Sequence, residues 1–472
     1  MLCPPRTRRD FLNSTACGFG SLALAGLLDR EAPAAPGPAV PVAHVLPKAK
    51  RIIFLFMAGG VSQVDSFDHK PLLDDLDGES REFADSRTRA RSGKGTNARV
   101  MKSLWPFRPR GECGKWTSDL FPAIGTHVDR LCFLHGMHTE GVAHGPATLF
   151  LHTGTTTQIR PSMGSWVSYA LGSGSENLPA FVSLAPSIGN GGPRNYGHAF
   201  LPALHQGTAV GRAGLSARDA GIRFLGNTAR DAAAEQAQFD LVQTLNREQA
   251  AMRVGDPAVE AIVESYELAW RMQAFAPDVL DLASETPATL DLYGIGQKPT
   301  DEYGRLCLMA RRLAEAGVRY IQVNYTDNSN NPAWDQHSNM PKHADHAEAV
   351  DRPIAGLLTD LAARGLLEDT LVWWGGEFGR NPFAQSNGTG RDHDPDGFTV
   401  WLAGGGVKGG FSHGATDEFG HVAVEGRTHM HDLHATVLHL LGIDHTRLTY
   451  PFAGRDFRLT DVAGEVISPI LS

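Results

Sequence analysis

The sequence predicts an α/β protein with a mostly parallel sheet that is flanked by helices on both faces. Two observations lead to this fold class. The run from Arg51 to Met57 is continuously apolar and ends at Gly59 and Gly60, which is typical of a buried parallel strand that enters a tight turn. In the C-terminal half, helical and strand-like segments alternate, as they do where helices connect parallel strands.

The remaining elements follow in chain order. Residues 72–120 are rich in loops, and 130–134 form a second candidate strand. Residues 229–292 have helical composition, so they form either a cover over one side of the sheet or an inserted cap. The alternating segments predict helices at 306–316, 346–364 and 433–441, and strands at 318–323, 370–374 and 398–402.

The N-terminal segment has the features of a twin-arginine export signal. Arg8 and Arg9 precede a short apolar run at 16–28, and an Ala- and Pro-rich stretch follows at 32–43. That run is shorter than the ~20 residues that a spanning helix needs. We therefore expect residues 1–46 to be signal and linker, and 47–472 to form one domain with a helical insertion at about 229–292. This predicts a periplasmic or extracellular protein that uses the twin-arginine export machinery and has no stable membrane span.

Charge and cysteine content exclude some classes of protein. The net charge of −9 argues against a nucleic-acid partner. Five cysteines without a Cys-x-x-Cys pair argue against both a disulfide scaffold and a thiolate zinc site. The three cysteines beyond the leader form at most one disulfide. One basic stretch, from Arg87 to Lys115, contains Glu112 as its single acid, and it is either a solvated loop or a rim that attracts phosphate or sulfate groups.

Polar clusters lie next to the predicted strands, where ligands bind in parallel sheets. Carboxylate and imidazole together suit Zn²⁺, with Ca²⁺ or Mn²⁺ as alternatives, so a divalent metal site is expected. Arg380 either binds an anion through two hydrogen bonds from its guanidinium or forms an ion pair with Glu377. The cluster residues are Ser62, Asp65 and Asp68 after the first strand, Asp335 and His337 after 318–323, Glu377 and Arg380 after 370–374, and His393 before 398–402.

Several of these segments together resemble a bacterial family, the domain of unknown function 1501, which lies in the alkaline phosphatase-like superfamily. The resemblance implies an alkaline phosphatase-like fold over nearly the whole mature chain. The C-terminal segments 432–436 and 454–456 resemble the planctomycete-type members of the family. The other segments that carry the resemblance are the leader, 59–68, 334–337, 376–380, 390–393 and 402–410.

The resemblance implies one metal site held by Asp335, His337 and His393, which occur in the order found in the superfamily. A second metal site is incomplete by the same comparison. Glu377 stands where an Asp-His pair begins, but Phe378 replaces the histidine. Asp65 is the nearest candidate for the acid that normally follows the first strand.

His144 stands where related sulfatases carry their nucleophile, a modified Cys or Ser before a Thr-Gly pair, here Thr153 and Gly154. An imidazole at this position is a candidate catalytic base or a metal ligand, and the alternative is a packed core residue. Ser62 and Thr148 are the nearest candidates for a nucleophilic hydroxyl. We therefore expect direct attack by metal-activated water, with no covalent intermediate.

Two functions follow from these expectations. The first is a metal-dependent hydrolase of sulfate or phosphate esters in the cell envelope, acting on a small-molecule or glycan anionic ester. The second is a non-catalytic member of the same fold that binds envelope glycans or proteins. The other histidines are expected to be structural: His429, His431, His434 and His439 near a helix that Asp432 caps, and His343 and His346 on an exposed helix surface.

Overall fold

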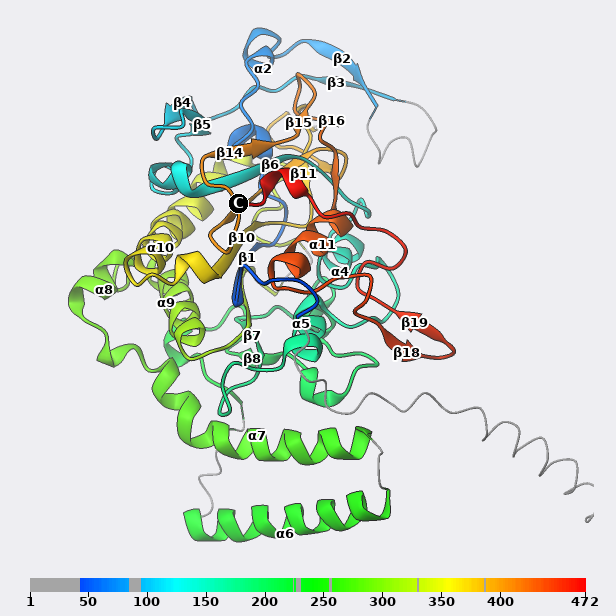
Figure 1. Cartoon of the computed structure of the whole chain (residues 1–472). Helices are drawn as coiled ribbons and strands as arrows, with labels where there is room; N and C mark the ends of the chain where they lie inside the picture. The colour runs from blue at the N-terminus through cyan, green and yellow to red at the C-terminus, as the bar shows by residue number, and fades with distance from the viewer. Residues whose placement is uncertain are drawn as a thin grey trace, which may run out of the picture.

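The structure is a computed structural model that describes residues 43–84, 95–223, 225, 231–253, 257–328, 331–385 and 388–472 (Figure 1). The predicted export signal, with Arg8 and Arg9, lies outside the described residues. So do residues 87–94 of the basic stretch. Within the described residues, no helix is both long and apolar enough to span a membrane.

In the described part of the chain, a nine-stranded sheet forms the centre, in the order β14-β6-β13-β10-β1-β9-β7-β8, with β17 beside β6. From β10 to β8 all neighbouring strands are parallel, whereas β13 is antiparallel to both of its neighbours. The predicted α/β fold class with a mostly parallel sheet is therefore confirmed. The strands are β1 Arg51–Met57, β6 Leu131–His138, β7 Phe181–Leu184, β8 Thr208–Val210, β9 Tyr320–Tyr325, β10 Thr370–Gly375, β13 Phe398–Ala403, β14 Phe411–His413 and β17 Thr428–His429.

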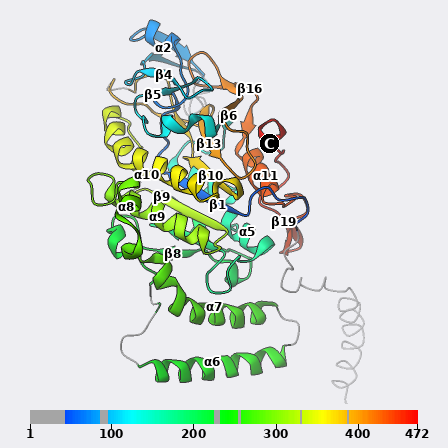
Figure 2. The same cartoon turned by 60° about the vertical axis from the view of Figure 1, so that its left-hand side comes forward.

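Helices cover both faces of this sheet, and the alternation of side chains along β1 shows why (Figure 2). Ile53 and Leu55 point into a core shared with α9 and α10, whereas Ile52 and Phe54 point into a second core shared with α4, α5 and α11. Since both faces are buried, the strand is apolar throughout, as its sequence predicted. The helices are α4 His144–Thr153, α5 Met163–Leu171, α9 Asp301–Glu315, α10 His343–Ala363 and α11 Met430–Leu440.

The segment predicted to be helical at 229–292 contains α6 Ala232–Met252, α7 Pro257–Leu280 and α8 Pro287–Leu292. Helices α6 and α7 lie side by side at one end of the molecule (Figures 1 and 2). The rings of Phe239 and Trp270 stack between them at 4.7 Å. Because α6 packs on α7 away from the sheet, it does not cover a sheet face.

Small elements complete the described chain. The predicted loop-rich segment 72–120 contains two short hairpins, in which Arg108 and Arg110 both pair with Asp119 at 2.7 Å. Cys113, Cys132 and Cys307 are all free. The small elements are α2 Leu72–Asp75, β2 Ser80–Phe83, β3 Thr96–Arg99, β4 Phe107–Arg110, β5 Lys115–Ser118, β11 Gly379–Arg380, β12 His393–Asp394, β15 Ala415–Thr416, β16 Ala423–Glu425, β18 Tyr450–Phe452, β19 Arg455–Phe457, and the 3-10 turns η1 Gln63–Asp65, η2 Ile124–Arg130, η3 Gly192–Tyr196, η4 Ala203–His205, η5 Ala217–Asp219, η6 Leu282–Ser284, η7 Met340–Lys342, η8 Leu367–Asp369 and η9 Ser468–Ile470.

Two expectations about histidine-rich helix ends were wrong. His429, not Asp432, is the N-cap of α11, and the Asp432 carboxylate accepts a hydrogen bond from the His429 N–H at 2.8 Å in a capping box. His343 is fully buried rather than exposed, because it begins α10 and packs against the Trp334 ring at 5.0 Å.

His152 makes the fold sensitive to acid. It lies in α4 between Phe54 and Phe56, and burial lowers its pKa to about 3. A histidine in the unfolded chain has a pKa of about 6.5, so below this pH the unfolded state binds a proton that the folded state does not bind. The free energy of unfolding therefore falls as the pH falls below about 6.5. When the pH is lowered from about 7 to about 5, we expect the free energy of unfolding of His152→Leu to fall by about 2 kcal/mol less than that of the wild type. Urea unfolding in the presence of a chelator measures this difference.

The matched control is His439→Leu, on a partly exposed residue of α11. Its pH dependence is expected to follow that of the wild type. Equal pH dependence in all three proteins would show that His152 does not contribute to acid sensitivity.

Candidate metal centre

The strand directions bring distant parts of the chain to one edge of the sheet. Asp335 and His337 follow β9, and Glu377 follows β10, so they lie at the carboxyl ends of parallel strands. Since β13 is antiparallel to β10 and to β6, the start of β13 and the end of β6 lie at this same edge. His393, before β13, and His144, after β6, are thereby brought to the other residues.

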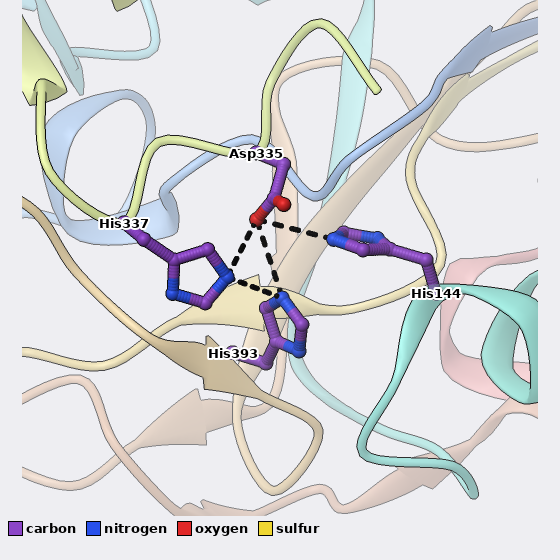
Figure 3. Close-up of side chains that lie close together, drawn as sticks. All are labelled: His144, Asp335, His337 and His393. Carbon is purple, nitrogen blue, oxygen red and sulfur yellow. Dashed lines mark hydrogen bonds and ion pairs between the residues drawn. The ribbon is translucent and has the colours of Figure 1, made fainter. Parts of the chain in front are cut away.

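Four side chains converge on one point: His144, Asp335, His337 and His393 (Figure 3). The Asp335 Oδ1 atom lies 2.9 Å from His337 Nε2, 3.1 Å from His144 Nε2 and 3.2 Å from His393 Nε2. The Nε2 atoms of His337 and His393 are 3.0 Å apart. The candidate ligand atoms all lie within 4.8 Å of one another, as a metal site with one ligand atom per residue requires.

The opposite nitrogen of each imidazole, Nδ1, contacts a group that accepts hydrogen bonds. A carboxylate or a carbonyl oxygen only accepts, so in the neutral tautomer that satisfies these three contacts Nδ1 carries the ring proton and Nε2 is left with a lone pair. The partners are Glu377 Oε1 for His144 at 2.6 Å, Val142 O for His393 at 2.8 Å and Gln385 Oε1 for His337 at 2.7 Å.

This arrangement places four acceptor atoms face to face, which requires a cation between them. His144 Nε2 is buried and makes no hydrogen bond of acceptable geometry, although Asp335 lies close to it. A proton on His144 is one such cation: burial opposes it, but the contacts with Asp335 and Glu377 raise the pKa of this imidazole. A divalent metal is the other, and the donor set of imidazole nitrogen and carboxylate oxygen fits Zn²⁺.

The charge states of two ligands suit a metal. Burial opposes ionisation of Asp335, but its contacts with the three histidines and the charge of Arg380 hold its pKa well below the ordinary value. Burial lowers the pKa of His393 to about 4, against the opposing effect of Asp335. Asp335 is therefore anionic and His393 neutral at neutral pH, and these are the forms that bind metals.

Arg380 has neither of the two roles anticipated for it. It is fully buried, and its Nη2 donates to Asp335 Oδ1 at 2.7 Å instead of pairing with Glu377. Its other donors are directed to backbone carbonyls, including Gly60 O at 3.1 Å and Arg391 O at 3.2 Å. Since the guanidinium is surrounded by acceptors of the protein itself, it positions Asp335 and is not available to bind an anion through two hydrogen bonds.

Asp65 is not brought into the group of four. Its Oδ2 accepts from Ser62 Oγ at 2.6 Å and from Arg391 Nε at 2.8 Å, and its Oδ1 accepts from Leu104 N at 3.0 Å. The carboxylate thus holds the loop after β1 against the buried Arg391. The Ser62 hydroxyl donates to the same carboxylate and is fully buried, so an ester substrate does not reach it in the described structure.

Glu377 lies behind His144. Its two oxygens accept from the Gly59 N–H at 3.0 and 3.1 Å, and one of them also contacts His144 Nδ1. Gly59 has φ +111°, and a Cβ there would lie 2.7 Å from the Asp335 nitrogen, so a side chain at this position would displace the Asp335 loop. Glu377 therefore orients His144 instead of pointing an oxygen at the centre.

The structure thus defines a mixed α/β protein with a centre of three histidines and one aspartate at the carboxyl edge of its sheet. The chain belongs to the family described as protein of unknown function (DUF1501), whose model matches residues 49–471. Among curated proteins, none matches the sequence.

The solved structures that the fold resembles include a sulfatase, an alkaline phosphatase and a lipoteichoic acid synthase, all at low identity. PsFucS1 sulfatase from Pseudoalteromonas sp. is 14% identical, with 94% of this chain and 75% of that chain covered and a TM-score of 0.37. Alkaline phosphatase from the Antarctic bacterium TAB5 is 10% identical, with 77% and 94% covered and a TM-score of 0.31. The lipoteichoic acid synthase LtaP from Listeria monocytogenes is 9% identical, with 87% and 75% covered and a TM-score of 0.34.

Proposed function

We propose that the protein is a metal-dependent hydrolase of sulfate or phosphate esters in the cell envelope. The observation that carries the proposal is the set of three imidazoles whose Nδ1 atoms are each held by an acceptor while their Nε2 atoms converge on Asp335. Acceptors behind the ligating histidines are typical of metal sites, where they fix the tautomer and the ring orientation. The preference of imidazole for Zn²⁺ over Ca²⁺ or Mn²⁺ makes zinc the proposed metal.

A metal held here would polarise the ester and lower the pKa of a bound water. In this proposal Asp335, His337 and His393 hold the metal. His144 takes up or returns the proton at its Nε2, and Glu377 keeps that ring oriented and offsets the charge of the imidazolium. The His337 side chain is 28% exposed, whereas those of His144, Asp335 and His393 are 7% exposed or less, so His337 is the most exposed of the four residues.

A second candidate function is a non-catalytic member that binds glycans or proteins of the envelope. One observation favours it: four protein ligands would fill all the positions of a tetrahedral metal. Structural zinc sites are closed in this way, whereas catalytic ones keep a position open. The number of protein ligands therefore separates the two functions.

The test combines activity with coordination. We expect the zinc-loaded protein to hydrolyse an aryl sulfate or an aryl phosphate and to lose this activity after chelation. X-ray absorption at the zinc edge is expected to find three protein ligands and one exchangeable oxygen. A zinc site with four protein ligands, together with no hydrolysis of either ester, would establish the binding function instead.

We further propose that the chain is exported by the twin-arginine route to the periplasm or beyond, as its paired arginines suggest, and that it is of the planctomycete type. Replacing both Arg8 and Arg9 with lysine is expected to retain the precursor in the cytoplasm, because the export machinery reads this pair. Cell fractionation with an antibody to the chain measures the distribution. Normal amounts in the periplasm would show that another route exports it.

A further inference from the structure

Helix α6 has two faces, and one of them is exposed in the described part of the chain. The other face packs on α7, where the Phe239 ring stacks on Trp270 and Gln243 Nε2 donates to Val263 O at 3.4 Å. Leu241 comes two residues after Phe239 and therefore lies on the opposite side of the helix, where it is 61% exposed. A single exposed leucine is common in proteins, so the pattern of the whole face decides its meaning.

The exposed face has the spacing of a coiled-coil seam. Its residues recur at alternating intervals of four and three positions, so they form one stripe along the helix. All six are exposed, and the three large apolar ones, Leu241, Leu245 and Met252, are 61%, 56% and 78% exposed. The spacing indicates a surface against which a second helix packs. The residues of this α6 stripe are Ala234, Gln238, Leu241, Leu245, Glu248 and Met252.

The α6 stripe is complementary to itself when two copies of the helix run antiparallel. A two-fold axis centred on position 243 places Leu241 opposite Leu245 of the partner subunit, and Leu245 opposite the partner's Leu241. The same axis places an amide opposite a carboxylate, at 238 and 248, and a small side chain opposite a large one, at 234 and 252. A dimer with two-fold symmetry requires a surface that matches itself in this way.

The charges of α6 and its caps favour the same antiparallel direction. Three of the four acids lie before Leu241, whereas both arginines lie after Leu245. Two-fold pairing therefore brings Asp240 near the partner's Arg247. Arg247 also contacts Glu267 of α7 at 3.0 Å, but its side chain is 67% exposed and its guanidinium has further donors. The charged residues are Asp231, Glu235, Asp240, Arg247, Glu248 and Arg253.

We infer that α6 is a dimerisation helix, which pairs in antiparallel direction with α6 of a second copy of this chain. It is the outermost helix at its end of the molecule, so a second copy can approach it along its length of about 32 Å (Figures 1 and 2). A membrane surface fits this helix less well, because four acids against two arginines are repelled by anionic lipid.

Analytical ultracentrifugation of the full-length chain, at concentrations from about 1 to 100 µM, tests the pairing. We expect the wild type to form a dimer in this range. Leu241→Glu is expected to weaken the dimer about 100-fold or more, because each dimer then buries two carboxylates opposite leucine. Glutamate is a good helix former, so α6 remains helical, which circular dichroism checks. The matched control Leu215→Glu changes a leucine outside α6 that is 58% exposed, and is expected to leave the dimer unchanged.

A second substitution tests the direction of the two helices. Adding Leu245→Arg to Leu241→Glu is expected to recover about tenfold of the lost affinity or more. In the antiparallel pair, the new arginine of one copy lies opposite the new carboxylate of the other. A parallel pair would place like charges opposite each other, and the affinity would not recover.

Three results would overturn the inference. The first is a wild-type chain that stays monomeric over the whole range, and protection of its α6 amides from hydrogen exchange would then indicate that another segment of the chain covers the stripe. The second is a dimer that Leu241→Glu does not weaken, or whose affinity Leu245→Arg does not restore. The third is sedimentation of the wild type, but not of Leu241→Glu, with phosphatidylglycerol vesicles, which would indicate a lipid-binding helix. None of these readouts involves metal or ester hydrolysis, so the inference does not depend on the proposed function.

Discussion

His337→Ala and His393→Ala are each expected to reduce the affinity for the proposed metal by more than about 100-fold. This loss exceeds the range of about 10- to 100-fold that is typical when a residue that hydrogen-bonds a metal ligand is replaced. Each substitution removes one of the Nε2 atoms that lie within 3.2 Å of Asp335 Oδ1. The wild-type chain, purified from metal-replete cells, is expected to contain about one divalent metal, which orders the site as it binds. Elemental analysis and competition with a zinc indicator dye measure both quantities.

Two further variants sharpen this experiment. Gln385→Leu keeps all four ligands but removes the acceptor behind His337, so an intermediate loss of about 10- to 100-fold is expected. The control His439→Ala removes a histidine from α11, outside the group of four, and is expected to change nothing. A wild-type chain free of metal, or equal metal content in all variants, would refute the metal site.

His144→Ala is expected to lower the turnover of a slow ester substrate by about 10²- to 10⁴-fold, the usual range for loss of a general acid or base. The imidazole is buried, its Nδ1 is held by Glu377 at 2.6 Å, and its Nε2 faces the centre. Glu377→Gln retains an acceptor oxygen for His144 but removes the charge, so a smaller loss is expected. Circular dichroism checks that the variants fold, and metal content checks that they still bind the metal. A fall in turnover at full metal occupancy would show that His144 acts in proton transfer and not as a metal ligand.

The same substrate tests the route of attack. Ser62 donates to Asp65 at 2.6 Å and is fully buried, so its hydroxyl is not accessible to a substrate in the described structure. Direct attack by water therefore predicts that intact mass spectrometry after rapid quench finds no modified chain. A phosphoryl or sulfuryl adduct on Ser62, Thr148 or any other side chain would contradict this mechanism.

Much of the fold could be predicted because burial on both faces makes some central strands nearly continuous apolar runs, as in β1 and β10. Strand direction could not be predicted in the same way, because the apolar run of β13 is the same in either direction. The short strands β7 and β8 were missed, since their runs are too brief to stand out from the surrounding loops.

The candidate site was predicted in part for a related reason. Asp335, His337 and His393 stand beside recognisable strands, and the structure does bring them together. His144 joins them through a connection that no local pattern reveals, and its place among the candidate ligands was seen only from a resemblance. His393 Nδ1 contacts the backbone carbonyl of Val142. Every residue has such a carbonyl, so this partner could not be identified from the sequence.

The antiparallel strand β13 has a consequence for the order in which the molecule is made. His144 and Glu377 are 233 positions apart, and His393 and its acceptor Val142 are 251 apart. His144 is synthesised long before Asp335, His337 and His393, so the complete set of proposed metal ligands does not exist during most of synthesis. Contacts of such long range also form late in folding, because their loops must close first. If the chain binds the proposed metal, it therefore does so late, after the central sheet has assembled.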